Sequence, residues 1–186
     1  MRTITEEMKN QCSKMMVSLY EYLPMKYKAT PRDWQVRKFI WGFKDGLCGL
    51  SAASVVCQKI SQYISKEEAK NIVFACIPAS SAAKTEARYK EFAEAVCKEM
   101  GFINGYNAIH VEGERLAIHE TGTSKHIKNT EVITFDRDFF NGKNVLVFDD
   151  ILTQGFSYAN FACSLEKIGA SVLGGLFLGK TILRSI

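Results

Sequence analysis

Apolar residues in the N-terminal third of the chain recur at the three- and four-residue spacing of helices. Thr3 and Glu6 could form a capping box at the start of a first helix, which would end before Pro24. Its apolar face would comprise Met8, Cys12, Met15, Met16, Leu19 and Leu23. A second helix is predicted from Pro31, and a third over residues 50–64. The pattern therefore predicts an N-terminal region built of helices.

From Asn71 onward the pattern alternates between strands and helices. Asn71–Ile77 is a continuous apolar run that Pro78 stops, which is typical of a strand covered on both faces. Gly101 closes the next helix, whose apolar face carries Tyr89, Phe92, Ala93, Val96, Cys97 and Met100. Further strands are predicted within residues 102–111, 131–135, 144–148 and 171–178, and a helix over 157–168. This alternation predicts an α/β fold with a mostly parallel central sheet flanked by helices.

The length of 186 residues suits a single domain with one hydrophobic core. Residues 1–70 would form its helical N-terminal extension and residues 71–186 its α/β core. Residues 112–130 break the alternation of strands and helices, because they are polar and their apolar residues do not recur at a regular spacing. Long loops inside compact domains are often functional lids, so a long exposed loop is predicted here.

The composition changes this picture little. The net charge is +4, and the cations are scattered rather than gathered in a stripe, which argues against nucleic acid as a partner. Six cysteines are spread without a CxxC pair, and three histidines show no metal spacing, which favours reduced thiols and no zinc site. The chain opens on a polar segment and has no apolar run long enough to span a membrane, so we expect a cytoplasmic protein.

The segment Val145–Ser157 (VLVFDDILTQGFS) carries the most specific signal in the chain. Its apolar strand would deliver Asp149 and Asp150 to the carboxyl edge of the sheet, where open α/β sheets bind ligands. The turn that follows leads into a helix, so its backbone N–H groups and hydroxyls could hold a phosphate. The predicted phosphate loop is Thr153, Gln154, Gly155, Phe156 and Ser157.

Two readings of the acidic pair stay open. Asp149 and Asp150 could merely end a strand and cap a loop. Alternatively, they could bind ribose hydroxyls or lie near a Mg²⁺ ion, either of which would offset two adjacent negative charges beside a phosphate. The apolar run before the pair and the Thr/Gly/Ser loop after it favour the ligand site.

On these residues the segment resembles the phosphoribosyl-pyrophosphate signature of type I phosphoribosyltransferases. Gln154 and Phe156 depart from that signature, which usually has small or hydroxylic residues in this loop. The order of residues 36–44 (VRKFIWGFK), a helix and the strand 72–78 is similar to the ComF-type, amidophosphoribosyltransferase-like branch. The N-terminal zinc-binding cysteine cluster of that branch is missing from this chain.

The resemblance implies roles for further residues. A pyrophosphate loop would consist of Ala79, Ser80 and Ser81. Residues 112–130 would be the mobile loop, with Arg115 and Lys125 as catalytic cations beside Asp149 and Asp150. Lys84 and Arg88, one helical turn apart, could face the phosphates or be solvated surface charges. The helical N-terminal region would form the hood over the acceptor.

The resemblance also implies an activity. The protein would transfer phosphoribose from phosphoribosyl pyrophosphate, with Mg²⁺, to a nitrogen acceptor and release pyrophosphate, and it could form a homodimer. The alternatives are a sensor that binds the metabolite without turnover and a ComF-like role in DNA uptake. An aromatic cluster on the second helix could stack an acceptor base, although a core role is favoured: Trp34, Phe39, Trp41 and Phe43.

Overall fold

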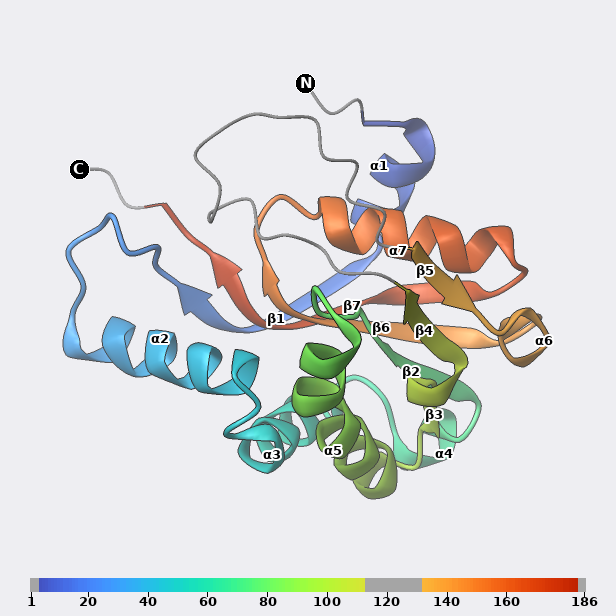
Figure 1. Ribbon diagram of the computed structural model, residues 1–186, viewed down its shortest axis with the longest axis horizontal. Coiled ribbons are helices and arrows are strands. Elements are labelled where there is room, and N and C mark those ends of the chain that lie inside the picture. The colour runs from blue at the N-terminus through green and yellow to red at the C-terminus, as the bar shows by residue number, and fades with distance from the viewer. Residues whose placement is uncertain (1–3, 113–131, 184–186) are drawn as a thin grey trace.

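A five-stranded parallel sheet forms the centre of the computed structural model, which describes residues 4–112 and 132–183. Its strand order is β1-β7-β6-β2-β3 (Figure 1). The strands are β1 (Met15–Tyr22), β2 (Ile72–Cys76), β3 (Ile103–Asn104), β6 (Asn144–Leu152) and β7 (Ser171–Thr181). The predicted α/β fold with a parallel central sheet flanked by helices is thereby confirmed.

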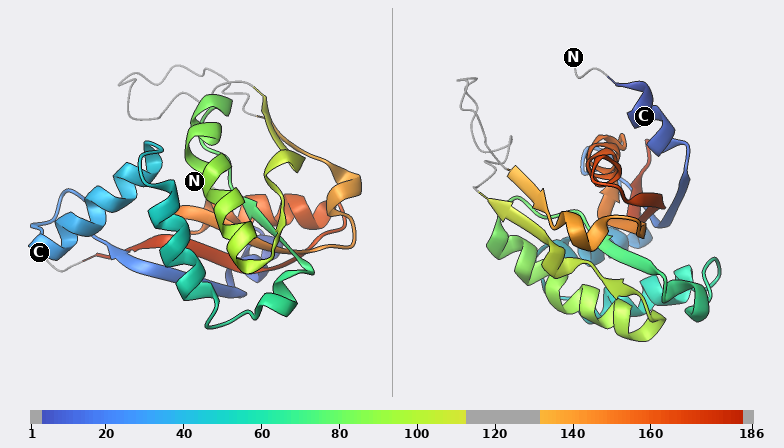
Figure 2. Two further views of the ribbon diagram at one scale, coloured as in Figure 1. Left: turned by 90° about the horizontal axis from the view of Figure 1, so that it is seen from below. Right: turned by 90° about the vertical axis from the view of Figure 1, so that its right-hand side faces the viewer.

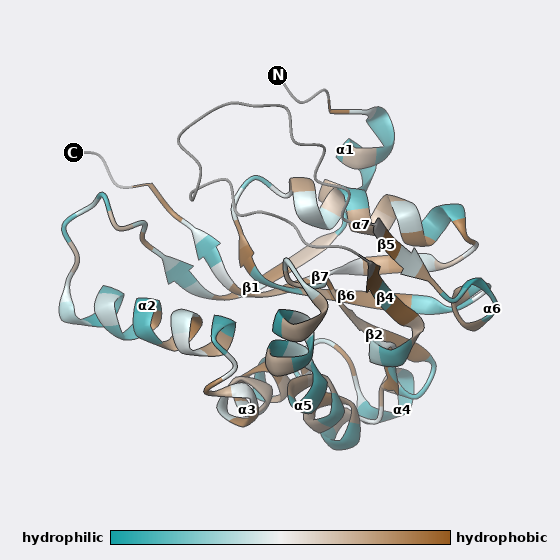
Figure 3. Cartoon of the chain, viewed as in Figure 1, coloured by the Kyte–Doolittle hydropathy of each residue, from teal (hydrophilic) through white to brown (hydrophobic). Residues whose placement is uncertain are grey.

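Helices cover both faces of this sheet (Figures 1 and 2). One face carries α1 (Glu6–Cys12) and α7 (Phe156–Lys167), and the other carries α2 (Pro31–Lys44), α3 (Gly49–Ile60), α4 (Lys66–Ala69) and α5 (Ala82–Met100). A small antiparallel pair, β4 (Ile109–Glu112) and β5 (Val132–Phe135), follows the 3₁₀ helix η1 (Tyr106–Ala108) and precedes α6 (Arg137–Phe140). Figure 3 shows hydrophilic residues on α2, α4 and α5, as expected of helices with one face in solvent.

The direction of chain progression reverses between β2 and β6. From β2 the chain crosses through α5 to β3, whereas from β6 it crosses through α7 to β7 on the other side. Helices α5 and α7 therefore lie on opposite faces of the sheet. In an open α/β sheet the carboxyl ends of two such strands frame a crevice, which is the usual place of a ligand site.

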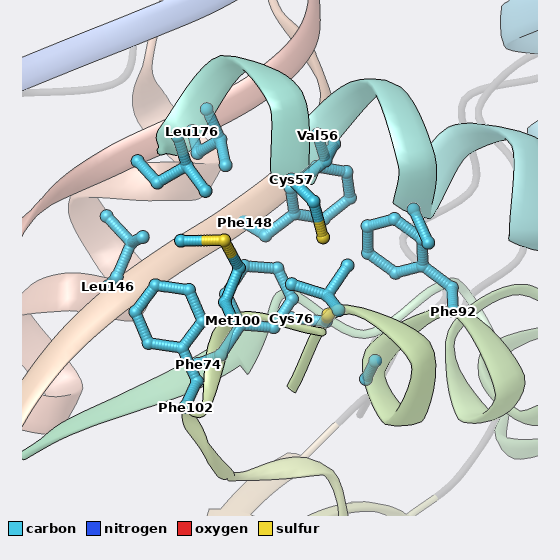
Figure 4. Packing of buried hydrophobic residues seen from close by; sticks show 14 of the residues in the cluster. Val56, Cys57, Phe74, Cys76, Phe92, Met100, Phe102, Leu146, Phe148 and Leu176 are labelled. Atoms are coloured by element: carbon cyan, nitrogen blue, oxygen red, sulfur yellow. The ribbon is translucent and has the colours of Figure 1, made fainter. Parts of the chain in front are cut away.

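Aromatic packing joins α5 to the sheet beneath this crevice (Figure 4). The rings of Phe92 on α5 and Phe148 on β6 lie 4.6 Å apart between centroids, and Phe74 on β2 packs against both. Leu146 and Phe148 face this α5 side, while Val145 and Val147 face α7. The alternation fixes the face to which each later residue of β6 points.

The predicted first helix is wrong over its second half. Its cap is Thr5, whose hydroxyl accepts a hydrogen bond from the backbone N–H of Met8 at 3.2 Å, and α1 ends at Cys12. Met15–Tyr22 is instead an edge strand parallel to β7, in register from Met15–Gly174 to Tyr22–Thr181. The N-terminal region is therefore not wholly helical, because one of its segments completes the central sheet.

Most other predicted elements are confirmed with shifted ends. The helix from Pro31 has a complete capping box between Thr30 and Asp33, and the helix before Gly101 ends in a left-handed glycine with φ of 88°. The predicted strand within residues 102–111 is two short strands, β3 and β4. The strand predicted to end at Phe148 continues to Leu152, so the acidic pair lies inside β6.

Replacing Gly174 by alanine should destabilise the protein by about 1–3 kcal/mol, the usual cost of overpacking. A Cβ at this position would collide with the carbonyl oxygen of Met15 on β1. Urea unfolding measures the effect, with Leu173→Ala as the control, because Leu173 is a neighbouring residue that is 36% exposed. Equal, small losses in the two variants would contradict the close β1–β7 pairing.

Candidate functional site

The acidic pair lies where β6 loses one of its two neighbours. Pairing with β2 ends at Phe148, whose carbonyl accepts a hydrogen bond from the N–H of Ile77 at 2.9 Å. Pairing with β7 continues, with Asp149 opposite Phe177. Beyond Phe148, the β2 side of the strand is therefore open, and this opening coincides with the crevice between β2 and β6.

Asp149 and Asp150 point to opposite faces of β6, because residues in a strand alternate. Asp150 follows Leu146 and Phe148 toward α2 and α5. Asp149 follows Val145 and Val147 toward α7 and lines a hollow of about 190 Å³ beside the loop 153–157. The two carboxyl groups therefore meet different surroundings.

Asp150 is held by two cations. Arg88 Nη1 donates to its Oδ2 at 2.7 Å, and Lys44 Nζ lies 3.4 Å from its Oδ1. Arg88 also donates from Nε and Nη2 to the backbone oxygen of Lys44, at 3.0 and 2.9 Å. The exposed fractions of the Asp150 and Arg88 side chains are only 10% and 14%, so the ion pair between them is poorly screened by water.

Asp149 is partly buried and has a different charge balance. Burial, reinforced by the nearby Asp150 carboxylate, raises the pKa of Asp149 from its ordinary 3.8 to about 8. Its Oδ1 accepts a hydrogen bond from the backbone N–H of Asp150 at 2.8 Å. At neutral pH the pair is therefore one ionised carboxylate held by cations and one largely protonated carboxyl group that can also donate.

The loop 153–157 leads into an α7 N-terminus that has no side-chain cap. Its N-cap is Gly155, in the left-handed region with φ of 78°, whereas the hydroxyls of Thr30 and Ser81 cap α2 and α5. Uncapped N–H groups at the positive end of a helix are suited to bind an anion. The exposed residues Thr153 and Ser157 flank this end, and Thr153 Oγ1 lies 3.2 Å from Thr181 Oγ1.

Both departures from the signature are accommodated without disturbing the loop backbone. Gln154 is exposed. Phe156 is partly buried and packs against a small apolar cluster between α1 and α7, made up of Met8, Ala159 and Cys163. Its bulk therefore serves the contact with α1 and leaves the backbone of the loop open to a ligand.

A cleft of about 920 Å³ unites these groups at the carboxyl edge of the sheet. It extends from the ends of α2 and β1, past the acidic pair, to α7 and β5. Polar residues lining it include Tyr22, Lys44, Arg88, Asp149, Asp150, Thr153, Ser157 and Thr181. Apolar residues lining it include Ile77, Pro78, Ile133 and Phe135.

The residues predicted as a pyrophosphate loop adjoin this cleft without lining it. Ala79 is buried, and its N–H donates to Thr85 Oγ1 at 3.0 Å. Ser81 caps α5 by accepting from the N–H of Lys84 at 3.3 Å, and Ser80 is half-buried in the turn between them. The cleft is bordered instead by Ile77 and Pro78, so a role of these three residues in binding pyrophosphate stays a prediction.

Four further cations were expected near this site: Arg115, Lys125, Lys84 and Arg88. Arg115 and Lys125 lie outside the described residues. Arg88 lines the cleft but is paired with Asp150, and Lys84 is exposed.

The aromatic cluster on α2 serves mainly the core and the helix surface. Phe43 is fully buried against Phe92, and Trp34 and Trp41 form an edge-to-face pair. None of the four predicted aromatic residues lines the cleft. Tyr22, whose hydroxyl accepts from Trp41 Nε1 at 3.2 Å, does line it.

Sequence reasoning missed Lys44 and Tyr22 as cleft residues. Lys44 ends α2 and comes near Asp150 only in the assembled fold. Tyr22 ends β1 and comes near Thr181 only because β1 pairs with β7. A strand assignment for residues 15–22 would have placed Tyr22 at the same sheet edge as Asp150. No spacing in the sequence indicates Lys44.

Other predicted properties concern metals, thiols and membranes. Within residues 4–112 and 132–183, no group of three or more His, Cys, Asp or Glu side chains is placed to hold a metal ion. All six cysteines are free, and four are buried. No helix in these two ranges has the length and apolar character needed to cross a bilayer.

No family model matches the chain, and no curated protein matches it. Among solved structures, it is similar to the crystal structure of a purine phosphoribosyltransferase from Pyrococcus horikoshii Ot3, with 12% identity and a TM-score of 0.37. The match covers 92% of this chain and 97% of that one. A match at this level assigns neither a family nor an activity.

Replacing Asp149 by asparagine should stabilise the protein increasingly as the pH rises from about 4 to about 8. The folded state retains a proton that the unfolded state releases above the ordinary carboxyl pKa, so this residue costs stability across that window. Asparagine removes the ionisation and can still accept the Asp150 N–H bond. Urea unfolding of both proteins at several pH values measures the difference, and a difference that does not change with pH would refute the raised pKa.

Proposed function

We propose that the protein binds phosphoribosyl pyrophosphate and transfers its phosphoribosyl group to a nitrogen acceptor. The proposal rests on one observation. The Asp149 carboxyl group, at the crevice between β2 and β6, lies beside the N-terminus of α7, which no side chain caps. A sugar phosphate needs both features, because its hydroxyls require a carboxyl or amide partner and its phosphate requires N–H donors.

In this proposal, each part of the ligand would bind a different region of the cleft. The 5′-phosphate would bind the N–H groups at the start of α7, with the hydroxyls of Thr153 and Ser157. The ribose hydroxyls would hydrogen-bond to Asp149, which is adjacent to this loop in the 190 Å³ hollow. The cationic side, Lys44 and Arg88, would balance the Asp150 carboxylate.

The reaction would exchange one bond at the anomeric carbon for another. The bond from C1 to the pyrophosphate oxygen breaks, and pyrophosphate leaves with the electron pair. The acceptor nitrogen donates its lone pair to C1, and an acceptor N–H loses its proton to solvent or a base. Rate would come from orientation and from charge stabilisation in the cleft.

A magnesium ion would enter with the substrate. Mg²⁺ commonly binds one or two carboxylates together with substrate phosphates rather than a dedicated cage of protein ligands. Of the two acidic residues that line the cleft among the described residues, Asp150 is paired with Arg88 and Lys44, so Asp149 would hold the ion after releasing its proton. The ion would offset the charge of the leaving pyrophosphate.

A second candidate function is a sensor that binds the same ligand without turnover. The specific observation in its favour is that two groups suited to a reactive site are already engaged within the protein. Asp150 is paired with Arg88 and Lys44, and the N–H of Ala79 is bonded to Thr85. Binding and turnover therefore need separate measurements.

Ribose 5-phosphate and phosphoribosyl pyrophosphate should both raise the melting temperature of the wild-type protein. Ser157→Ala should lower the affinity for each ligand by about tenfold. This is the loss expected when a hydrogen bond to a charged group, worth about 1.5 kcal/mol, is removed. Ser61→Ala is the matched control, because Ser61 ends α3 and its hydroxyl donates to the backbone oxygen of Gln58. Calorimetric titration gives the affinities, and no binding of either ligand would remove the proposal.

Pyrophosphate release separates the two candidate functions. The protein is incubated with phosphoribosyl pyrophosphate, Mg²⁺ and each of a panel of nitrogen bases. An enzyme should release pyrophosphate at a rate that rises with the concentration of one of these bases. Tight binding without release for any acceptor would decide for the sensor. Asp149→Ala, which removes both the donor and the acceptor of this side chain, serves as the variant that should lower ribose binding in both cases.

A further inference from the structure

We infer that Lys44 is the ligand-facing cation of this cleft and that it binds the diphosphate end of the substrate. The inference rests on the proposed function and adds to it a residue from α2, far in sequence from the loop 153–157 and from residues 112–130. Its basis is that two neighbouring cations, Lys44 and Arg88, differ in exposure and in how many of their donors are already hydrogen-bonded within the protein.

Arg88 has little left to offer a ligand. Its Nε and Nη2 donate to the backbone oxygen of Lys44, and its Nη1 donates to Asp150 Oδ2. The side chain is only 14% exposed. Because all three nitrogens of the guanidinium already donate within the protein, Arg88 acts as a positioning residue rather than as a ligand contact.

Lys44 has the opposite character. Its side chain is 37% exposed, it lines the cleft, and its Nζ lies 3.4 Å from Asp150 Oδ1, its one ion-pair partner among the described residues. An ammonium group carries three donors, and an ion pair at this distance leaves them available to a second anion. Of the two cations that line the cleft among the described residues, Lys44 is thus the one with donors available to a ligand.

The backbone beneath Lys44 is fixed in place. Arg88 holds the carbonyl oxygen of Lys44 by two hydrogen bonds, and the next turn of chain packs tightly on α5. A Cβ on Gly46 would lie 2.7 Å from the carbonyl oxygen of Ala87, and its φ of 76° is one that glycine adopts without strain. The ammonium group is therefore presented from a rigid base, which favours binding of a fixed anion.

The charges of the cleft also favour an anion at this place. Two cations, Lys44 and Arg88, face one carboxylate, Asp150, whereas Asp149 points to the opposite face of β6. The local balance on the α2–α5 side is therefore about one positive charge. Such a local excess of positive charge attracts an anionic ligand.

The arrangement of these groups selects a ligand with anionic groups at both ends. The start of α7 lies on one face of β6, and Lys44 lies on the other, with Asp149 and Asp150 between them in one cleft. A ribose that carries a phosphate at one end and a diphosphate at the other spans this arrangement. Ribose 5-phosphate, which lacks the diphosphate, would use only the α7 side.

Lys44→Met tests the inference, because it removes the charge and keeps an unbranched apolar stem. Calorimetric titrations at fixed Mg²⁺ would compare ribose 5-phosphate with phosphoribosyl pyrophosphate. We expect a loss of at least tenfold in affinity for phosphoribosyl pyrophosphate and less than twofold for ribose 5-phosphate. Lys44→Arg should retain most of the affinity for both. The matched control is Lys98→Met, an exposed lysine in the last turn of α5.

The outcomes separate this inference from the proposed function. Failure of the wild type to bind either ligand would overturn both. Binding of both ligands by the wild type, with equal losses or no loss in Lys44→Met, would overturn the inference alone and leave Lys44 as a neutraliser of Asp150. If Lys44→Met does not fold, Lys44→Gln gives the same comparison with a polar side chain, and the same ratio of affinities decides.

Discussion

The buried ion pair between Asp150 and Arg88 is the constraint on which this cleft depends. A carboxylate that is 10% exposed cannot remain charged without partners, and removing one partner of such a pair is strongly destabilising. Here the partner comes from α5, and the same guanidinium holds the last residue of α2. One side chain thus connects the central strand β6 with two helices, and it does so within the cleft.

The two carboxyl groups of the acidic pair have different roles. An Asp-Asp sequence at the end of a strand suggests two equivalent carboxylates directed at one ligand. Because β6 continues through Leu152 in contact with β7, its side chains keep alternating, and the two groups face opposite sides. Asp150 becomes part of an ion-pair network, and Asp149 is left beside the loop 153–157. The repulsion between them is relieved by the cations on one side and by protonation on the other.

Much of the fold was predictable because local patterns decide it. The buried strand Ile72–Cys76, the helix closed by Gly101 and the glycine turn before α7 all show in composition and spacing. The strand Met15–Tyr22 was not predictable in this way, since its apolar residues also fit a helical period and its partner β7 lies more than 150 residues away. The pairing of Arg88 with Asp150 spans 62 residues and likewise depends on the assembled sheet. Of the candidate site, the loop and the acidic pair could therefore be predicted, but the cations that control the pair could not.

The unusual residues of the loop and the first helix account for each other. Phe156 is large for a position beside a phosphate loop, yet it packs on Met8 of α1 together with Ala159 and Cys163 of α7. Helix α1 is short, with seven residues, and an isolated helix of that length is marginal in water, so this contact supports it. In return α1 covers the back of the loop, where a Cβ on Gly155 would lie 3.2 Å from Cys12 Sγ. A loop held from behind in this way keeps its N–H groups in place before a ligand arrives, and preorganised donors of this kind lose less entropy on binding.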